Sequence, residues 1–382
     1  MNVVFAINVP YPSGMAGSMR IRLFAEYLIK NSYNVKVVST NQENGNNCKE
    51  GNSYGIEYSG LSHLQYPYYL FLVIYPFLVF SKLRALKKKE SKNILFIYGD
   101  PDIYRAPYIV IGKLLGYKVI LDIVEDRALT EESLSIKASI NLIFGKIIFP
   151  FIIKMIDGVI VISKYLEKKY SSFQALPVVL IPVSAFNLSS HINLDYSIEG
   201  PLKIMYAGSF GTKDGVSYLL DSFIQINKEY ANTKLFLIGT PSKTIKDKIK
   251  RINNSNIHIT GYLSDEDYFK TLASADILCM TRINSPFANA GFPFKLGEYL
   301  ATGNPVIATD VSDIRLYLED KKNVVLAQPS SSESLIEAIR YLISEPEKRK
   351  AIGLMGLKKC EESFNPEING KKLSSFITKV SI

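Results

Sequence analysis

The sequence predicts an α/β protein with two tandem Rossmann-like, doubly wound domains that face a cleft. Short β-branched apolar runs alternate with longer helical stretches, and this pattern restarts after the polar stretch Ser184–Gly200. Continuous apolar strands between helices are typical of parallel sheets that helices cover on both faces. Ligands of such sheets bind beyond the carboxyl ends of the strands, where loops lead into helices.

The same pattern divides the chain into three segments. We expect a first domain over residues 1–190, a second over 200–363, and a C-terminal helix at 364–382 that returns to the first domain. The expected strands of the first domain are Val3–Ile7, Val35–Ser39, Ile94–Tyr98, Val119–Ile123, Gly158–Ile162 and Val178–Ile181. Those of the second are Lys203–Tyr206, Lys234–Ile238, Ile257–Ile259, Asp276–Met280, Pro305–Thr309 and Asn323–Leu326. The expected helices of the first domain include Ser18–Lys30, Tyr104–Leu115 and Ser133–Met155, and Asn41–Asn52 is expected to be a loop.

Composition and charge narrow the class of protein. The 382 residues carry 45 Lys and Arg against 36 Asp and Glu, and 47% of them are apolar, which is typical of a globular protein and excludes disorder. The net charge of +9 is spread over both halves and matches no nucleic-acid-binding motif. No nucleic-acid partner is therefore expected.

The cysteines and histidines are few and scattered. Cys48, Cys279 and Cys360 offer neither a disulfide framework nor a CxxC pair, which favours a reducing, cytoplasmic location. The three histidines are isolated, so no His-based zinc site can be written. We expect no metal and no cofactor, and we interpret the N-terminus, which has no basic leader, as a first buried strand.

One segment is unusual for a soluble protein. Tyr66–Phe80 is apolar and aromatic, and a basic cluster extends from Lys82 to Lys92. The run is shorter than a membrane span and contains prolines, so we expect it not to cross a bilayer. It suits an interfacial segment on an anionic cytoplasmic leaflet, and a buried helix with a solvated basic end is the equal alternative. Ile136–Ile156 carries the same ambiguity.

The most specific stretch is Gly291–Asp310, which reads GFPFKLGEYLATGNPVIATD. It predicts a loop, a helix over Phe294–Ala301 and then a strand. A loop that leads into a helix N-terminus directs free N–H groups and the positive end of the helix dipole at an anion, such as a diphosphate. Glu298 follows one turn later, where its carboxylate can accept hydrogen bonds from ribose hydroxyls. Alternatively, Lys295 and Glu298 form a surface i, i+3 ion pair.

This stretch resembles the donor-binding signature of the retaining, GT-B-fold glycosyltransferases of family four, also called group 1. Other segments are similar to motifs of that family in the same order, so that the resemblance covers nearly the whole chain: Pro10–Arg22, Ile156–Leu166, Met205–Gly215 and Ile257–Asp276. It implies that the second domain binds a nucleotide-diphosphate sugar and the first an acceptor. The implied donor contacts are Gly208, Ser209, Lys213, Gly291, Phe292, Pro293, Phe294, Lys295, Leu296 and Glu298. The implied loop towards the phosphates and the acceptor contains Gly14, Gly17, Ser18 and Arg20.

The chain departs from the family pattern at three places. Ala290 stands where the family often has Glu, and Ser209 where many members have Arg. In these respects the chain resembles a branch with a Pro-x-Lys-Leu-x-Glu-Tyr helix, in which Lys295 supplies the positive charge. The first-domain His is absent, and Glu125 and Asp126 lie at a strand end instead, similar to branches with an acidic motif there. From the residues alone, this acidic pair could equally cap the next segment or bind Arg127.

The resemblance implies a retaining transfer from the nucleotide sugar to a hydroxyl. In it, the departing diphosphate is stabilised by lysines and takes the acceptor proton itself. The candidate catalytic residues are Asp126, Glu125, Lys213 and Glu298. The expected acceptor is a glycan or a polyprenyl-linked sugar in cell-surface polysaccharide synthesis, such as lipopolysaccharide or capsule. A nucleotide-sugar epimerase and a non-catalytic nucleotide-sugar binder or partner subunit are the alternatives.

Overall fold

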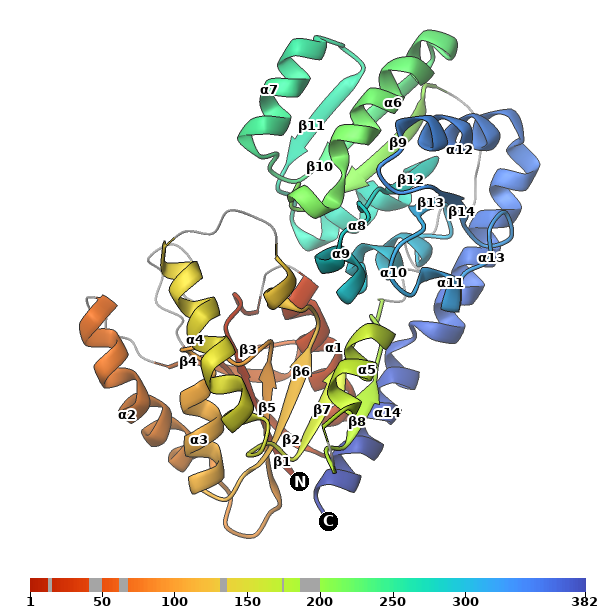
Figure 1. Cartoon of the computed structure of the whole chain (residues 1–382). Coiled ribbons are helices and arrows are strands. Elements are labelled where there is room, and N and C mark those ends of the chain that lie inside the picture. Colours follow the sequence, from red (N-terminus) through yellow and green to blue (C-terminus); the bar gives the residue numbers. More distant parts are fainter. Residues whose placement is uncertain (13–15, 41–49, 62–67, 131–135, 174, 186–199) are drawn as a thin grey trace. The chain divides into compact units, whose positions relative to one another are not determined.

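The computed structural model describes residues 1–12, 16–40, 50–61, 68–130, 136–173, 175–185 and 200–382 (Figure 1). They form two units: unit 1 is Met1–Pro182 together with Pro366–Ile382, and unit 2 is Val183–Asn365. Each unit holds one sheet that is parallel or nearly so, with helices packed on it. The predicted two-domain α/β class is confirmed.

The sheet of unit 1 has the order β3-β4-β2-β1-β5-β6-β7-β8, and only the β3–β4 pair is antiparallel among the described strands. Its strands are β1 (Asn2–Ile7), β2 (Asn34–Ser39), β3 (Gly51–Ser53), β4 (Ile56–Gly60), β5 (Asn93–Tyr98), β6 (Lys118–Ile123), β7 (Gly158–Val161) and β8 (Val178–Leu180). Its helices are α1 (Ala16–Lys30), α2 (Tyr68–Leu86), α3 (Ala106–Leu114), α4 (Ile136–Ile152), α5 (Lys164–Ser171) and α14 (Pro366–Val380), with the 3₁₀ turn η1 (Arg127–Leu129).

The edge strands β3 and β4 were not predicted. They pair with each other, and β4 adds to β2 in parallel register, with Val37 opposite Tyr58. Both are short, and neither has the apolar β-branched run that indicates a buried strand. The expected loop at Asn41–Asn52 is therefore wrong at Gly51 and Asn52, which lie in β3, and residues 41–49 of that loop lie outside the described residues.

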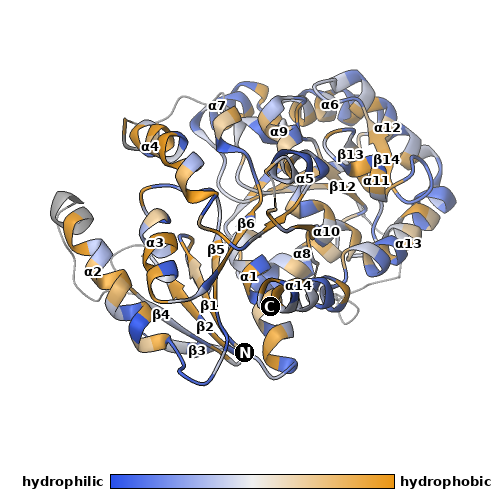
Figure 2. Ribbon diagram, turned by 60° about the horizontal axis from the view of Figure 1, so that its bottom comes forward, coloured by the Kyte–Doolittle hydropathy of each residue, from blue (hydrophilic) through white to orange (hydrophobic). Residues whose placement is uncertain are grey.

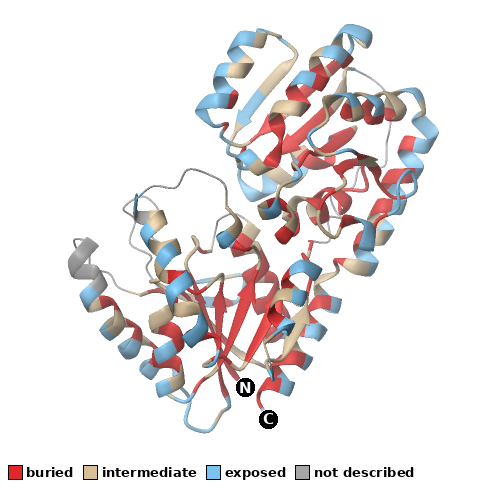
Figure 3. Ribbon diagram, viewed as in Figure 1, coloured by how far each residue is buried: buried red, intermediate tan, exposed pale blue. Residues whose placement is uncertain are grey.

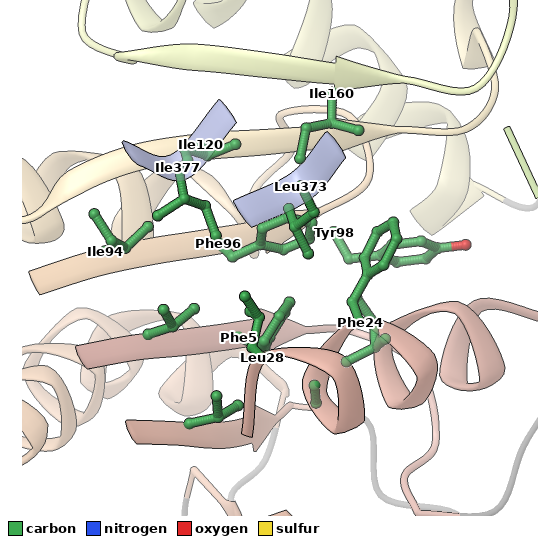
Figure 4. Packing of buried hydrophobic residues seen from close by; sticks show 14 of the residues in the cluster. Phe5, Phe24, Leu28, Ile94, Phe96, Tyr98, Ile120, Ile160, Leu373 and Ile377 are labelled. Atoms are coloured by element: carbon green, nitrogen blue, oxygen red, sulfur yellow. The ribbon is translucent and has the colours of Figure 1, made fainter. Parts of the chain in front are cut away.

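The core of unit 1 joins the sheet to helices from both ends of the chain (Figure 4). The rings of Phe5 on β1 and Phe96 on β5 have centroids 4.6 Å apart, and Phe24 of α1 packs on the same cluster. Leu373 and Ile377 of α14 complete it. Since burying one such side chain contributes about 1.5–3 kcal/mol, these contacts fix the C-terminal helix in unit 1.

The sheet of unit 2 is parallel throughout the named strands, in the order β11-β10-β9-β12-β13-β14. Its strands, all at predicted positions, are β9 (Leu202–Ala207), β10 (Thr233–Ile238), β11 (Ile257–Gly261), β12 (Ile277–Met280), β13 (Val306–Thr309) and β14 (Val325–Ala327). Its helices are α6 (Val216–Glu229), α7 (Lys243–Ile252), α8 (Asp265–Ala273), α9 (Pro286–Ala290), α10 (Phe294–Leu300), α11 (Ile314–Tyr317), α12 (Ser332–Ser344) and α13 (Pro346–Ser363), with the 3₁₀ turn η2 (Thr212–Asp214).

Burial follows the layers of each unit. The central strands are buried along their length, whereas the helices alternate buried and exposed residues (Figure 3). This is the pattern of sheets covered on both faces. No helix in the described part of the chain has the length and apolar character needed to cross a membrane.

Candidate active site

The sheet of unit 2 reverses its strand order between β9 and β12. From β9 the chain continues through β10 and β11 on one side, and from β12 it continues through β13 and β14 on the other. In open parallel sheets, ligands bind at the carboxyl ends of the strands at such a switch point. Residues 208–215 follow β9 and residues 281–293 follow β12. We call these segments loop A and loop B.

Loop A approaches the end of β12 closely. A Cβ atom at Gly215, which has a φ of 62°, would lie 2.1 Å from the carbonyl oxygen of Thr281. The Thr281 hydroxyl donates a hydrogen bond of 2.8 Å to the carbonyl oxygen of Asp214. The ammonium of Lys213 lies 4.6 Å from the centroid of the Phe287 ring, a cation–π contact with loop B. Because a side chain at position 215 would collide with the Thr281 carbonyl, glycine is required there for loop A to contact loop B.

Lys295 of α10 also reaches loop A. Its ammonium lies 2.8 Å from Oδ1 of Asp214 and donates to the Tyr206 hydroxyl at 2.7 Å. Burial lowers the pKa of Lys295, and the Asp214 carboxylate partly offsets this effect. Burial opposes the ionisation of Asp214 as well, but the Lys295 ammonium, the Arg282 guanidinium and the Tyr206 hydroxyl together outweigh it and lower the pKa of Asp214 to about 2. A Cβ atom at Gly208 would lie 2.3 Å from Nζ of Lys295, so the glycine makes room for this lysine.

Asp214 has further partners that the sequence did not indicate. Its Oδ2 accepts hydrogen bonds from the Ser209 hydroxyl at 3.1 Å and from the Gly211 N–H at 3.2 Å. Ser209, an implied donor contact, therefore holds the aspartate in this structure. The buried guanidinium of Arg282, two residues beyond β12, adds positive charge near Asp214 and Lys295. A charged residue just beyond the end of a buried strand was the available signal for Arg282.

Glu298 lies one turn after Lys295 and has a different partner. The Tyr268 hydroxyl of α8 donates a hydrogen bond of 2.7 Å to Oε2 of Glu298. Burial raises the pKa of Glu298, and this hydrogen bond opposes the rise. The alternative of a Lys295–Glu298 surface ion pair is wrong, because the two side chains bind Asp214 and Tyr268 respectively.

Two implied donor contacts on the segment before and within α10 are core residues. The Phe292 ring packs on Tyr317 and Phe364, and Leu296 is fully buried. Their side chains therefore belong to the core of unit 2, and a donor contact through the backbone of this segment stays a prediction. Gly291, Pro293 and Phe294 form the turn into α10. Ala290, in place of the family's Glu, is buried at the end of α9.

The implied phosphate loop of unit 1 has structural contacts. The Arg20 guanidinium is buried, donates to both carboxylate oxygens of Asp122 at 2.8 and 2.9 Å, and also donates to the carbonyl oxygens of Ile181 and Pro182. Each of its three side-chain nitrogens thus donates within unit 1, which favours a structural role, and the implied contact with phosphate stays a prediction. Ser18 is also buried and donates to the carbonyl of Pro10.

Gly17 and Gly14 have different outcomes. A Cβ atom at Gly17 would lie 2.8 Å from the Tyr98 hydroxyl, so glycine permits α1 to start against β5. Gly14 lies outside the described residues.

The acidic pair after β6 is fixed on both sides. Asp126 is buried, accepts from the Ala128 N–H at 3.2 Å at the start of η1, and binds the Lys169 ammonium at 2.6 Å. Glu125 lies 3.7 Å from the Arg127 guanidinium. Both capping and pairing with Arg127 therefore occur.

Nearby, at the end of β5, burial raises the pKa of Asp100 to about 6. Among the described residues, no three His, Cys, Asp or Glu side chains are grouped so that they could hold a metal ion.

Comparisons with known proteins agree with this architecture. Residues 195–358 match the model of the family described as glycosyl transferases group 1. An uncharacterised glycosyltransferase of Methanocaldococcus jannaschii is 26% identical over 294 residues, which are 76% of each chain. An MMP alpha-(1->4)-mannosyltransferase of Mycolicibacterium hassiacum is 26% identical over 155 residues, which cover 40% of this chain and 36% of the relative.

Solved structures are similar over the whole chain. Sucrose-phosphate synthase of Thermosynechococcus elongatus has a TM-score of 0.77 at 16% identity, covering 100% of this chain and 99% of the other. Anabaena HepE in complex with UDP-glucose has a TM-score of 0.74 at 14% identity, covering 99% of both chains. The fold of two Rossmann-like units is thus the GT-B fold. The match of residues 195–358 to the group 1 model, together with the glycosyltransferase relatives, identifies the chain as a glycosyltransferase enzyme.

Proposed function

We propose that this glycosyltransferase moves a sugar from a nucleoside diphosphate sugar to a hydroxyl of a lipid-linked or polysaccharide acceptor, with retention of the anomeric configuration. The observation that carries the donor half is the set of side chains at the switch point of unit 2. There Lys213 contacts loop B, Lys295 contacts loop A, and Glu298 lies one turn beyond Lys295. The HepE structures, which contain UDP, glucose or UDP-glucose, support a donor of this class.

The donor site has to stabilise the leaving group. The bond between the anomeric carbon and the diphosphate oxygen breaks, and negative charge builds on the diphosphate. Lys213 and Lys295 are suited to neutralise that charge, because oriented cations in a partly dehydrated site stabilise it strongly. The Asp214 carboxylate favours the protonated form of Lys295, which burial disfavours. Glu298, oriented by Tyr268, is proposed to accept the ribose hydroxyls.

The acceptor half requires little base chemistry. The acceptor oxygen forms the new bond to the anomeric carbon, and its proton passes to the departing diphosphate oxygen on the same face of the sugar. We assign Asp126 to orient the acceptor hydroxyl, since Lys169 and η1 hold its carboxylate in one place. Glu125 is the second carboxylate at this strand end. The proposal includes no metal ion, and treatment with EDTA should leave the rate unchanged.

A thermal-shift screen tests the donor site directly. The whole protein is scanned against UDP, GDP, CMP and their common sugar conjugates, because a bound ligand raises the unfolding midpoint by mass action. We expect a shift with one nucleoside diphosphate and its sugar, lost in Glu298→Ala and kept in the matched control Glu347→Ala on α13. No shift with any nucleotide would contradict the proposal.

A product analysis separates transfer from the alternatives. Without an acceptor, we expect slow hydrolysis of the nucleotide sugar that raised the unfolding midpoint in the screen. NMR should show that the free sugar formed first has kept the anomeric configuration of the donor. Interconversion of two sugar nucleotides would instead indicate an epimerase. Binding without any turnover, with glycan or lipid-linked acceptors present, would indicate a non-catalytic binder.

A further inference from the structure

Helices α2, α3 and α4 form one layer on unit 1. α2 connects β4 to β5, α3 connects β5 to β6 and α4 connects β6 to β7, so all three connections run in the same direction along the sheet. Because such connections between parallel strands are right-handed, the three helices lie on the same face. α2 packs against α3, and α3 packs against α4. Figure 1 shows the three helices on one side of the unit, and Figure 2 shows that apolar residues occur along all three.

The outer side of α4 is a continuous apolar stripe. Five side chains are exposed at successive intervals of four, three, four and four residues, with between 55% and 81% of their surface accessible: Ile136, Ile140, Ile143, Ile147 and Phe151. These intervals place all five on one side of an α-helix. On the opposite side Gly145 packs on Pro101, whose carbonyl oxygen would lie 2.6 Å from a Cβ atom there.

The neighbouring helices extend this surface. In the described part of α2, Val73, Phe77 and Phe80 are exposed, whereas the alternate side of the helix is buried through Tyr75 and Val79. On α3, Val110 and Leu114 are exposed, the latter at 78%. We call the outward apolar residues of α2, α3 and α4 the apolar face. Soluble monomers seldom expose so many large apolar side chains on neighbouring helices unless a partner covers them.

Charge identifies the kind of partner. None of the three helices contains an Asp or Glu, and the last turns of α2 and α3 carry Arg84 and Lys113. Lys146 and Lys154 are exposed on and after α4, and Lys87, Lys88 and Lys89 follow α2. Nζ of Lys87 lies 3.6 Å from the Cβ position of Gly116, just beyond α3, so this basic cluster borders the apolar face.

We propose that the apolar face docks unit 1 on the surface of an anionic lipid bilayer. Amphipathic helices with apolar side chains on one side and lysines at the border lie in the interface of such a bilayer. There the apolar side chains are buried among the lipids and the lysines are attracted to the anionic headgroups. Two copies of this face would bring like charges together, which disfavours self-association as the explanation. The inference deepens the proposed function, because a lipid-linked acceptor would be present at that surface, but it does not depend on the donor.

Flotation of the full-length protein with vesicles tests the proposal. We expect binding to vesicles of phosphatidylglycerol and phosphatidylcholine, and weak binding to phosphatidylcholine alone. Ile140→Gln/Ile147→Gln should lower the partition coefficient at least about tenfold, because two exposed isoleucines that would enter the bilayer are lost. Leu316→Gln, an exposed apolar residue of unit 2, is the matched control and should bind as the wild type does.

The electrostatic part has its own variants. Lys87→Gln/Lys88→Gln/Lys89→Gln should weaken binding to anionic vesicles by at least about tenfold, because three positive charges near the anionic surface are lost. Lys371→Gln/Lys372→Gln on α14 should have little effect. Failure of the wild type to float with anionic vesicles would overturn the inference. So would a dimer, seen by analytical ultracentrifugation, that the isoleucine variants dissociate. The nucleotide-induced thermal shift should persist in every variant, so the donor assignment is tested separately.

Discussion

The ammonium of Lys295 and the carboxylate of Asp214, 2.8 Å apart, connect helix α10 to loop A across the switch point of the unit 2 sheet. The lysine comes from the segment after β12 and the aspartate from the segment after β9. Tyr206, the penultimate residue of β9, also accepts a hydrogen bond from the lysine. Two segments some 80 residues apart in sequence thus hold one partly buried cation at the point where a diphosphate is proposed to bind.

Removing the carboxylate should destabilise the protein. In Asp214→Asn the partly buried Lys295 ammonium loses its counter-ion, which costs on the order of 3 kcal/mol. Lys295→Met should be similarly destabilised, and the double variant should recover part of the loss. Urea unfolding of the four proteins measures the coupling. If the losses of unfolding free energy of the two single variants add up to that of the double variant, Asp214 and Lys295 do not stabilise each other.

Acid should weaken the same contact. The folded-state pKa of Asp214 is about 2, below its ordinary value of 3.8. The ionised carboxylate therefore favours the folded state, and the stabilisation, on the order of 2 kcal/mol, is present above about pH 4 and lost as the pH falls towards 2. The loss of stability over this window should be smaller in Asp214→Asn than in the wild type. Thermal unfolding between pH 5 and pH 2 measures the difference, and parallel curves would contradict the assignment.

Glu298 and Lys213 should each be needed for turnover. With the donor that the thermal-shift screen identifies, Glu298→Ala and Lys213→Ala are expected to lower kcat/KM at least about 100-fold, which is the scale of losing one oriented charged group. Glu347→Ala and Lys228→Ala, both exposed on helices of unit 2, are the matched controls. Near wild-type rates in both site variants would refute the proposed donor site.

Arg20 should affect stability rather than catalysis. Arg20→Met leaves the buried carboxylate of Asp122 without its counter-ion, which costs about 3–5 kcal/mol. The nucleotide-induced shift of unit 2 should persist at a temperature where the variant is folded. A variant with wild-type stability that fails to bind nucleotide or acceptor would instead support the phosphate-loop interpretation.

Glycine at the loop contact should be irreplaceable. Gly215→Ala brings a Cβ atom to 2.1 Å from a backbone carbonyl at a positive φ, so the two segments have to separate. Gly55→Ala is the matched control, because Gly55 has a positive φ of 76° and no atom within 4 Å of the Cβ position. We expect a loss of about 1 kcal/mol for the control from backbone strain and clearly more for Gly215→Ala. Equal losses of unfolding free energy would show that the contact with β12 is unimportant.

The repeated pattern of apolar runs was enough to predict the two sheets. β1 and β5 are buried along their length, and the apolar side chains needed for this are visible in the sequence as uninterrupted runs. The antiparallel edge pair of β3 and β4 was missed, because an edge strand needs few apolar residues and its pairing depends on backbone hydrogen bonds. The prediction was most accurate where burial is most complete.

The local sequence pattern by itself predicted the two-domain α/β architecture and the loop-to-helix element at Gly291 that precedes Glu298. The resemblance of its motifs to a known family added Lys213 and Lys295 as candidates. Only the tertiary structure decided which partners these residues have. Asp214 and Tyr268 come from distant segments, and Arg20 and Phe292 have family-like positions but buried contacts. The physical reason is that local side-chain pattern determines secondary structure, whereas the protonation and accessibility of a side chain depend on neighbours that only the packing of distant strands and helices brings within a few ångströms.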